Sequence, residues 1–534
     1  MMTHIVNLSI RSGTFPKHLK TAWVLPLHKS SKTNVGIYRP VSILRTYSFC
    51  LVFFYRCSST MVGTFPLLSV QPTRGLVDEK IQVVVRNLPS ALSVTLHSLH
   101  RSEDKDLWEA FGHYTSDGQG TVTVAKDASL GGTYEGAEPM GLLWSMQPVP
   151  GSRTGLRLRK MDVLTPMVVH ISVYSGHITE GFSKQSPLAT VVTERWYMAP
   201  GVCRIDIREH GVRGTLFLPP GPGPFPGVLD MWGGGGGLVE YRSGLLASHG
   251  FVSMALEYLS HDKNRTSDIN FKTYFEKAFR IVQEHPMVMK DRVALFGLSL
   301  GTSVTLNLAA YSKDISPRCC VCISGSHVNL VNKAIGKVFR NMKKDGYKTR
   351  FDEEGRVVCR DIFLPIPTDL GEKVDMGRIK CPLMLVVGED DQNWATVESA
   401  KDMTQMMHAA GNEHLLTILQ YPDAGHLIEP PYTPHFRASN FIMPQTRQKL
   451  IMLWGGYTKP HAVAQEDCWE KILSFLRQHL YPSPDSTPTL RQSCDVTPKE
   501  HQGLILADVY RGVLDVLHLP QDIVELTKAC TYSA

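Results

Sequence analysis

Ser299 lies at the centre of Gly297-Leu298-Ser299-Leu300-Gly301, a GxSxG pentapeptide. Such a short pattern recurs by chance, so its meaning depends on its context. An apolar run at residues 292–297 precedes it, and a helical pattern at residues 302–311 follows it. Strand, sharp turn and helix form a nucleophile elbow, which lifts the serine hydroxyl out of a sheet and sets it at a helix N-terminus. We therefore predict that Ser299 is a nucleophile rather than part of an ordinary glycine-rich turn.

A serine hydroxyl attacks well only when a base removes its proton and an acid orients that base. In the α/β-hydrolase arrangement these groups follow in the order Ser, Asp or Glu, His. The apolar run at residues 382–388 is followed by Glu389-Asp390-Asp391, at the strand end that would face the elbow. Asp391 is the favoured acid and Asp390 is the alternative. The next apolar run leads to His426, which we predict to be the base rather than a solvated loop histidine.

The reaction also needs two N–H donors for the oxyanion of the tetrahedral intermediate. One is expected from the backbone amide of Leu300, directly after the nucleophile. The other is expected from the five-glycine loop at residues 233–237, through the amides of Gly233 and Gly234, because glycine lets the backbone approach a substrate closely. The alternatives are a flexible surface linker or a phosphate-binding loop, and the second lacks the GK[ST] that should follow.

The elements around these residues divide the chain into four regions. Residues 1–60 show no sustained amphipathic pattern and are predicted to be an unstructured or foreign leader. Short alternating runs separated by turns predict a β-sandwich at residues 61–200. At residues 201–481, short apolar strands alternate with helical stretches, which predicts a mainly parallel α/β sheet. Residues 482–534 are expected to be a Pro/Ser-rich linker and a C-terminal extension of unknown role.

The basic residues are concentrated at the N-terminus of the chain. The 534 residues hold 56 Lys and Arg against 50 Asp and Glu, a net charge of +6. Residues 1–60 contain eight of the bases and no acid, which leaves 48 bases and 50 acids in the rest. A protein that binds duplex phosphates needs a basic face. The nearly neutral main body therefore argues against nucleic acid as a partner.

The eleven cysteines show no metal-binding pattern. Cys319, Cys320 and Cys322 crowd one apolar run, and no CxxC pair with histidine partners supports a zinc site. An odd number of cysteines without a secretory signal indicates reduced, mostly buried thiols. The most apolar stretch, residues 47–55, is far shorter than the roughly 20 residues of a transmembrane helix. We therefore expect neither a bound metal nor a membrane span.

Six segments resemble the acyl-CoA thioesterase and bile acid-CoA:amino acid N-acyltransferase family: residues 138–148, 214–251, 297–301, 387–394, 421–432 and 454–469. The resemblance extends from about residue 65 to residue 481. It implies an immunoglobulin-like β-sandwich followed by an α/β-hydrolase domain, which cleaves or transfers acyl groups of coenzyme A without a further cofactor. The family's nucleophile, acid and base fall on Ser299, Asp391 and His426. One departure is Leu300, where thioesterase members usually carry lysine.

Serine as nucleophile favours hydrolysis over transfer. A cysteine acyl-enzyme is a thioester, which favours attack by an amine, whereas a serine acyl-enzyme is an oxygen ester that is open to water. Ser299 therefore predicts a fatty acyl-CoA thioesterase. A monomer is expected, although the sequence does not fix the oligomeric state. An N-acyltransferase that uses glycine or taurine, a carboxylesterase and a non-catalytic acyl-CoA binder are the alternatives. Because the main body is nearly neutral, any positive field for the phosphates of coenzyme A must come from a few local side chains.

The two ends of the chain bear on its location. Residues 11–45 resemble a fragment of a retrotransposon reverse transcriptase without the polymerase aspartates, and Met61 is the start that we then expect. The same basic, acid-free leader has the composition of a mitochondrial transit peptide. The last residues, 532–534, read Tyr-Ser-Ala rather than a tripeptide like Ser-Lys-Leu. We expect a cytoplasmic protein, with the mitochondrial matrix as the alternative and no peroxisomal import through the C-terminal tripeptide.

Overall fold

The computed structural model describes residues 65–259, 271–328, 349–442 and 449–482. Those up to Tyr481 belong to one compact unit. The predictions for the leader, for a start at Met61 and for the C-terminal extension concern residues outside the described ranges, and the domain boundaries stay predictions.

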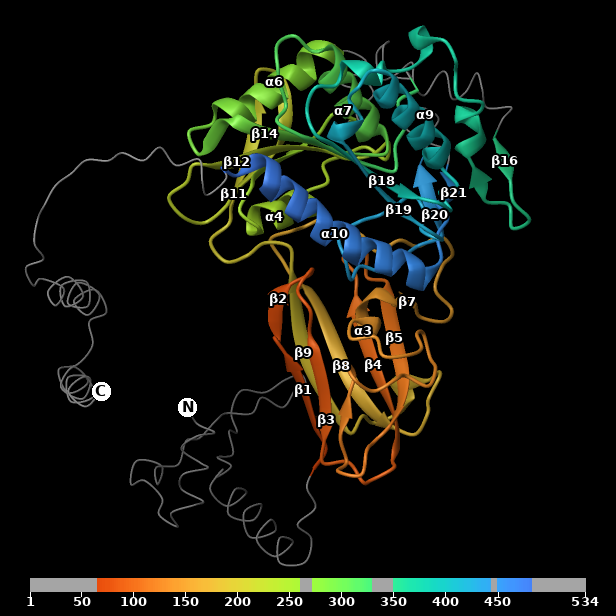
Figure 1. The fold of residues 1–534 in the computed structure, drawn as a ribbon. Helices are drawn as coiled ribbons and strands as arrows, with labels where there is room; N and C mark the ends of the chain where they lie inside the picture. The colour runs from red at the N-terminus through yellow and green to blue at the C-terminus, as the bar shows by residue number, and fades with distance from the viewer. Residues whose placement is uncertain (1–64, 260–270, 329–348, 443–448, 483–534) are drawn as a thin grey trace, which may run out of the picture. The chain divides into compact units, whose positions relative to one another are not determined.

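Two antiparallel sheets form the first part of the chain, and they are drawn in red to yellow in Figure 1. The smaller sheet has the order β1-β3-β6, with β1 (Leu67–Gln71), β3 (Gln82–Arg86) and β6 (Val122–Thr123). The larger has the order β2-β9-β8-β4-β5-β7, with β2 (Arg74–Leu76), β4 (Ser93–Arg101), β5 (Leu107–Thr115), β7 (Gln147–Pro148), β8 (Met167–Ser175) and β9 (Ala189–Trp196); β2 alone pairs in parallel. A short helix, α3 (Gly141–Trp144), packs beside β5.

The two sheets bury a shared core, which makes this region a β-sandwich. In β3, alternate side chains point inward, so that Val83 and Val85 are buried while the strand ends are exposed. They meet Leu96, Trp108 and Ile171 of the larger sheet in one hydrophobic cluster. The sandwich expected from the alternating runs is confirmed.

The second part of the chain contains an eight-stranded sheet of order β10-β11-β13-β12-β14-β15-β18-β19. The first two strands pair antiparallel, as do β11 and β13, and all later pairs are parallel. Its strands are β10 (Cys203–Glu209), β11 (Val212–Leu218), β12 (Phe225–Met231), β13 (Val252–Leu256), β14 (Val288–Leu298), β15 (Cys320–Ile323), β18 (Leu383–Gly388) and β19 (Leu416–Tyr421). The predicted mainly parallel α/β sheet is thus confirmed.

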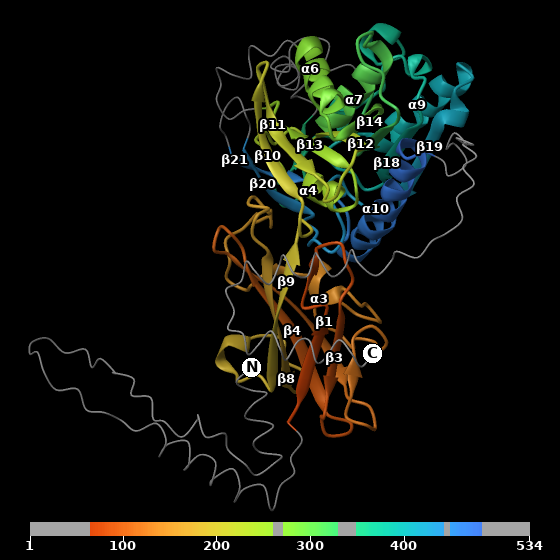
Figure 2. The same cartoon turned by 90° about the vertical axis from the view of Figure 1, so that its left-hand side faces the viewer.

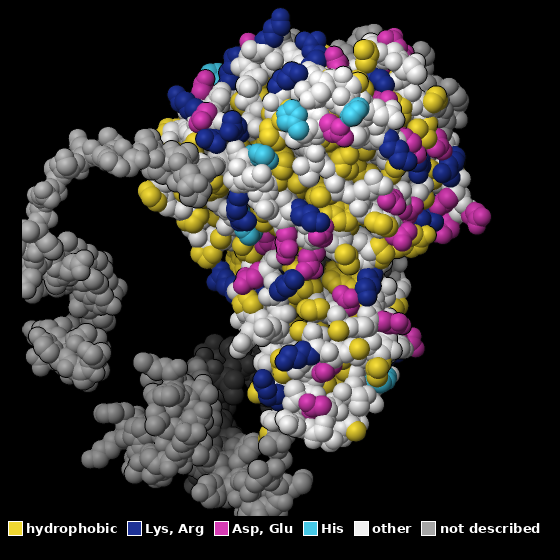
Figure 3. All heavy atoms as spheres, in the orientation of Figure 1, with side chains coloured by type: hydrophobic (Ala, Val, Ile, Leu, Met, Phe, Trp, Pro, Cys, Tyr) yellow, Lys and Arg dark blue, Asp and Glu magenta, His cyan; other side chains and the backbone are white. Residues whose placement is uncertain are grey.

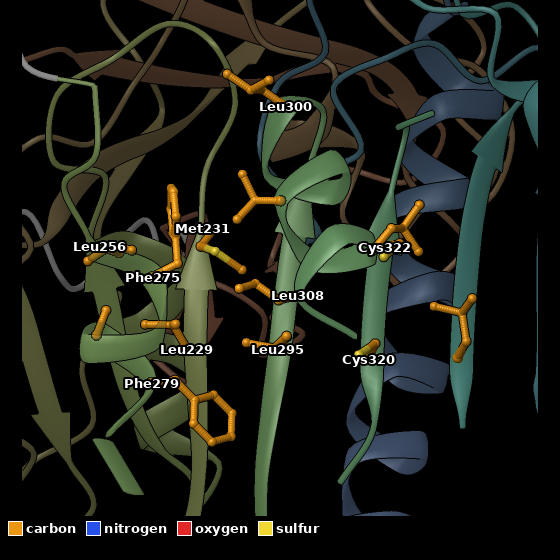
Figure 4. Packing of buried hydrophobic residues seen from close by; sticks show 14 of the residues in the cluster. Leu229, Met231, Leu256, Phe275, Phe279, Leu295, Leu300, Leu308, Cys320 and Cys322 are labelled. Carbon is orange, nitrogen blue, oxygen red and sulfur yellow. The ribbon is translucent and has the colours of Figure 1, made fainter. Parts of the chain in front are cut away.

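Helices cover both faces of this sheet (Figures 1 and 2). The helices are α4 (Tyr241–Ser248), α6 (Phe271–Glu284), α7 (Leu300–Tyr311), α9 (Thr396–Ala409) and α10 (Thr458–Leu480). Side chains of α6, α7 and α9 belong to one hydrophobic cluster, and those of α4 and α10 belong to a second. Figure 4 shows the first cluster, in which Phe275 and Phe279 pack toward Leu229 and Met231 of β12.

A four-stranded sheet of order β16-β17-β21-β20 lies outside the main sheet and was not predicted. Its strands are β16 (Arg350–Phe351), β17 (Val357–Val358), β20 (Ala438–Ile442) and β21 (Lys449–Leu453). β16 and β17 have two residues each, and the sequences of β20 and β21 do not alternate between apolar and polar residues, so no period of two marks these strands.

Candidate active site

Ser299 stands between the end of β14 and the start of α7, in the strand-turn-helix arrangement of an elbow. Its backbone has φ 56° and ψ −118°, a region that residues with a side chain rarely enter. A side chain at position 297 would overlap the backbone of Gly301, and one at position 301 would overlap the carbonyl of Met231. The two glycines of GxSxG are therefore needed because the turn leaves no room for a Cβ atom.

The side chains of Ser299, His426 and Asp391 form one hydrogen-bonded line. His426 Nε2 lies 2.9 Å from Ser299 Oγ, and its Nδ1 lies 2.7 Å from Asp391 Oδ2. The three residues are 6%, 1% and 2% exposed, respectively. Because an ionised carboxylate only accepts, Nδ1 carries the proton and Nε2 is free to accept one from the serine.

Asp391 is held in place by the backbone after β18. Its Oδ1 accepts hydrogen bonds from the amides of Asn393 and Trp394, both at 2.8 Å, which leaves Oδ2 for His426. Asp390, the alternative acid, points elsewhere. Its Oδ2 accepts from Arg437 Nη1 at 2.5 Å and from the amide of Gly456 at 2.9 Å. The geometry thus joins Asp391, and not Asp390, to the histidine.

The glycine loop packs against the nucleophile. A Cβ atom on Gly233 would lie 3.1 Å from Ser299 Cβ and 3.5 Å from its Oγ. Gly234 follows in the same loop and is half-buried. Leu300 begins α7, and its side chain is 2% exposed within the core, where Figure 4 labels it. Leu300 therefore contributes backbone rather than side chain to the site, and the oxyanion role of these amides stays a prediction.

A second histidine, His461 on α10, holds the loop that carries His426. Its Nδ1 accepts from the amide of Gly425 at 3.0 Å, and its Nε2 donates to the carbonyl of Leu427 at 2.8 Å. The bond to Nδ1 requires a neutral ring, because a protonated nitrogen cannot accept, and burial lowers the pKa of His461 to about 4. Sequence reasoning missed this residue, and the only signal for it was its place in a segment that resembles the family.

Two tryptophans flank the ring of His426. Trp454 lies 5.8 Å from it between ring centroids and Trp394 lies 6.4 Å from it, with interplanar angles of 15° and 22°. The amide of His426 also donates to the carbonyl of Trp454 at 2.9 Å. These contacts leave the imidazole little freedom to rotate away from the serine.

Comparisons with known proteins show the family of the chain. The family model described as "Acyl-CoA thioester hydrolase/BAAT N-terminal region" matches residues 78–209, and the model "BAAT / Acyl-CoA thioester hydrolase C terminal" matches residues 272–482. Acyl-coenzyme A thioesterase 5 of Mus musculus is 37% identical over 440 residues, which are 79% of this chain and 99% of that protein. The chain belongs to the acyl-CoA thioester hydrolase/BAAT family.

Other relatives cover similar shares. The peroxisomal succinyl-coenzyme A thioesterase of Mus musculus is 38% identical over 77% of this chain and 96% of its own length. Acyl-coenzyme A thioesterase 1 of Homo sapiens is 37% identical over 76% of this chain and 94% of its own length. Among solved structures, a dienelactone hydrolase-like phosphotriesterase from metagenomic libraries aligns with 52% of this chain and 98% of its own, at 16% identity and a TM-score of 0.33.

The parts matched by the two acyl-CoA thioester hydrolase/BAAT models touch beside the histidine loop, residues 423–427, which carries His426. Arg157, in the N-terminal part, donates from Nη2 to Glu429 Oε1 at 2.6 Å, and Glu429 follows His426 by three residues. Tyr241 donates to the same carboxylate oxygen. Asn440 Nδ2 donates to the carbonyl of Gly155 at 2.7 Å. The segment after β7 therefore forms part of the surroundings of the site.

Neither a membrane helix nor a metal cluster occurs in the described part of this family member. None of its helices there has the length and apolar character that crossing a bilayer requires. No group of three His, Cys, Asp or Glu side chains there could hold a metal ion. Cys320 and Cys322 lie in the core beside α7, as free thiols.

Proposed function

We propose that this chain is an acyl-CoA thioester hydrolase that works through Ser299, His426 and Asp391. The observation that carries the proposal is the buried hydrogen-bonded line from Asp391 Oδ2 through His426 to Ser299 Oγ. Relatives that align over almost their whole length are 37–38% identical to this chain and bear the name acyl-coenzyme A thioesterase. These names support acyl-CoA as the substrate.

In the first half of the reaction, the serine replaces the thiol. His426 Nε2 takes the proton of Ser299 Oγ while Oγ forms a bond to the thioester carbonyl carbon. The amides of Leu300 and the glycine loop hold the oxyanion. When the carbon–sulfur bond breaks, the sulfur takes the proton from His426, coenzyme A leaves as a thiol, and the acyl group stays on Ser299 as an ester.

In the second half, water replaces the serine. His426 Nε2 takes a proton from a water molecule, whose oxygen attacks the ester carbonyl. The bond from the acyl carbon to Oγ then breaks, and Oγ recovers its proton from His426. Throughout, Asp391 stabilises the charged imidazole and keeps Nδ1 protonated. The products are a free fatty acid and the original enzyme.

A triad does not by itself show whether water or an amine attacks the acyl-enzyme. The test must therefore measure both free acid and amide. We expect the full chain to release thiol and free acid in equal amounts from a long-chain acyl-CoA, with or without glycine or taurine. Ser299→Ala should lower kcat by about 10⁴-fold or more while the protein unfolds at a similar temperature. Ser299→Cys should shift product toward the amide, because its acyl-enzyme is a thioester.

Three results would contradict the proposal. More amide than free acid from the unmodified chain would favour an N-acyltransferase. Undiminished turnover in Ser299→Ala would exclude this mechanism. Faster cleavage of an oxygen ester than of the matching thioester would favour a carboxylesterase.

A further inference from the structure

A cavity of about 150 Å³ lies where the sandwich meets the second part of the chain. Its lining includes Arg101 at the end of β4, the segment Leu158–Lys160, the start of β8, and Thr433 beyond the histidine loop. Sites for whole small-molecule ligands usually measure roughly 300–1,000 Å³. This cavity therefore has room for one compact group of a larger ligand rather than for the whole ligand.

The cavity wall contains a half-buried cation, Arg159. Within the described residues, the side chain of Arg159 has no ion pair, and its Nε atom is buried without a hydrogen-bond partner. Burial, and then the neighbouring charge of Arg157, lower the pKa of Arg159. Removing a charge from water without pairing it costs free energy. An anion in the cavity would offset that cost.

The other charges around the cavity do not supply this anion. Lys160 Nζ pairs with Glu103 Oε1 at 2.5 Å, and Arg157 pairs with Glu429. Arg101 is exposed and has no ion-pair partner in the part of the chain that the structure describes. Of the residues that line the cavity, three are cations and one is a carboxylate, a local excess of +2. On the face shown in Figure 3, by contrast, basic and acidic side chains are mixed.

The unpaired arginine lies close to the elements that hold the active site. Arg157 and Arg159 are two residues apart in a segment without helix, and the charge of Glu429 acts on both. Glu429 also binds Tyr241, whose ring lies 5.2 Å from that of Trp232 between centroids. Trp232 directly precedes the glycine loop that packs on the nucleophile. These contacts link the surroundings of the cavity to the glycine loop of the active site.

We propose that this cavity binds a phosphate group of the coenzyme A part of the substrate, with Arg159 as the main contact. The inference rests on the proposed function. An acyl-CoA carries its phosphates at the far end of the long pantetheine arm, away from the thioester. The planar guanidinium of arginine donates two parallel hydrogen bonds to phosphate oxygens. One phosphate fits the size of the cavity, and its charge balances the local excess.

The test compares substrates with and without phosphates in the full chain. Arg159→Ala should lower kcat/KM for a long-chain acyl-CoA by about tenfold to a hundredfold, mainly through KM. For the matching acyl-pantetheine, which has no phosphate, kcat/KM of the variant should stay within about twofold of the value for the unmodified chain. Arg159→Lys keeps the positive charge but loses the planar guanidinium with its two parallel donors. Its kcat/KM for acyl-CoA should lie between those of the unmodified chain and Arg159→Ala. Arg86→Ala, which removes an exposed arginine of β3, should leave kcat/KM unchanged for both substrates.

Calorimetry distinguishes a site for a phosphate of coenzyme A from a site for free inorganic phosphate. Adenosine 3′,5′-bisphosphate should bind the unmodified chain and lose affinity in Arg159→Ala. Equal losses for both substrates, no loss for either, or Arg159-dependent binding of inorganic phosphate with an unchanged KM for acyl-CoA would each overturn the inference. Failure of the unmodified chain to hydrolyse any acyl thioester would instead contradict the proposed function, and the calorimetric result would still report on the cavity.

Discussion

The nucleophile elbow and the histidine loop, residues 423–427, are held in place in different ways. The elbow is shaped by its own neighbours, since glycines two positions on either side of Ser299 make room for the turn. The histidine loop is held by distant side chains, with His461 bonded to the backbone on both sides of His426. Reactive groups can therefore be found from local patterns, whereas the residues that position them depend on contacts between remote segments.

The largest effect is expected from changing Asp391, the acid that orients His426. Asp391→Asn should reduce kcat by about 10³–10⁴-fold, because an amide in place of the carboxylate favours the wrong tautomer of His426 and no longer stabilises the imidazolium. KM for acyl-CoA should change little. Steady-state kinetics on the full chain, with thermal unfolding to check the fold, measure this effect.

Asp390→Asn is the matched control. Asp390 ties the chain after β18 to Arg437 and to the amide of Gly456, but it does not touch His426. Its variant should lose about tenfold or less in kcat. If the variant at position 390 were as inactive as the one at position 391, the histidine would depend on its distant supports as strongly as on its acid.

The features that the sequence predicted are those that local patterns encode. The strands β12, β13, β14, β15, β18 and β19 of the main sheet and the three members of the triad were predicted, because each lies beside a recognisable local pattern. The contact between Arg157 and Glu429 joins residues 272 positions apart, and no local pattern encodes such a contact. The strands of the four-stranded sheet were missed because β16 and β17 have two residues each and the sequences of β20 and β21 do not alternate between apolar and polar residues.

His461 predicts a pH dependence of stability. In the unfolded chain its pKa returns to the ordinary 6.5, whereas burial lowers it to about 4 in the fold. Between these values the unfolded state binds the extra proton, so stability present above pH 6.5 is lost as the pH falls toward 4. The loss for this group should reach about 3 kcal/mol. Urea unfolding of the full chain at several pH values measures it.

The variant His461→Gln isolates that contribution. It cannot titrate, so its unfolding free energy should vary less between pH 6.5 and 4 than that of the unmodified chain. His414→Gln removes an exposed histidine and serves as the control. Identical slopes for the unmodified chain and His461→Gln would show that the clamp on the histidine loop does not depend on a neutral imidazole.

The smallest effect is expected at the elbow, from Gly301→Ala. The added methyl group would overlap the carbonyl of Met231 on β12, and such overpacking costs about 1–3 kcal/mol, against up to about 1 kcal/mol gained from the better helix former. Gly118→Ala meets no atom within 4 Å and should be neutral or slightly stabilising. Because α7 begins directly after Ser299, the shift that relieves the overlap should also move the serine hydroxyl. Urea unfolding and kcat should therefore fall together in Gly301→Ala, whereas a loss of stability with unchanged kcat would mean that the elbow can move without its nucleophile.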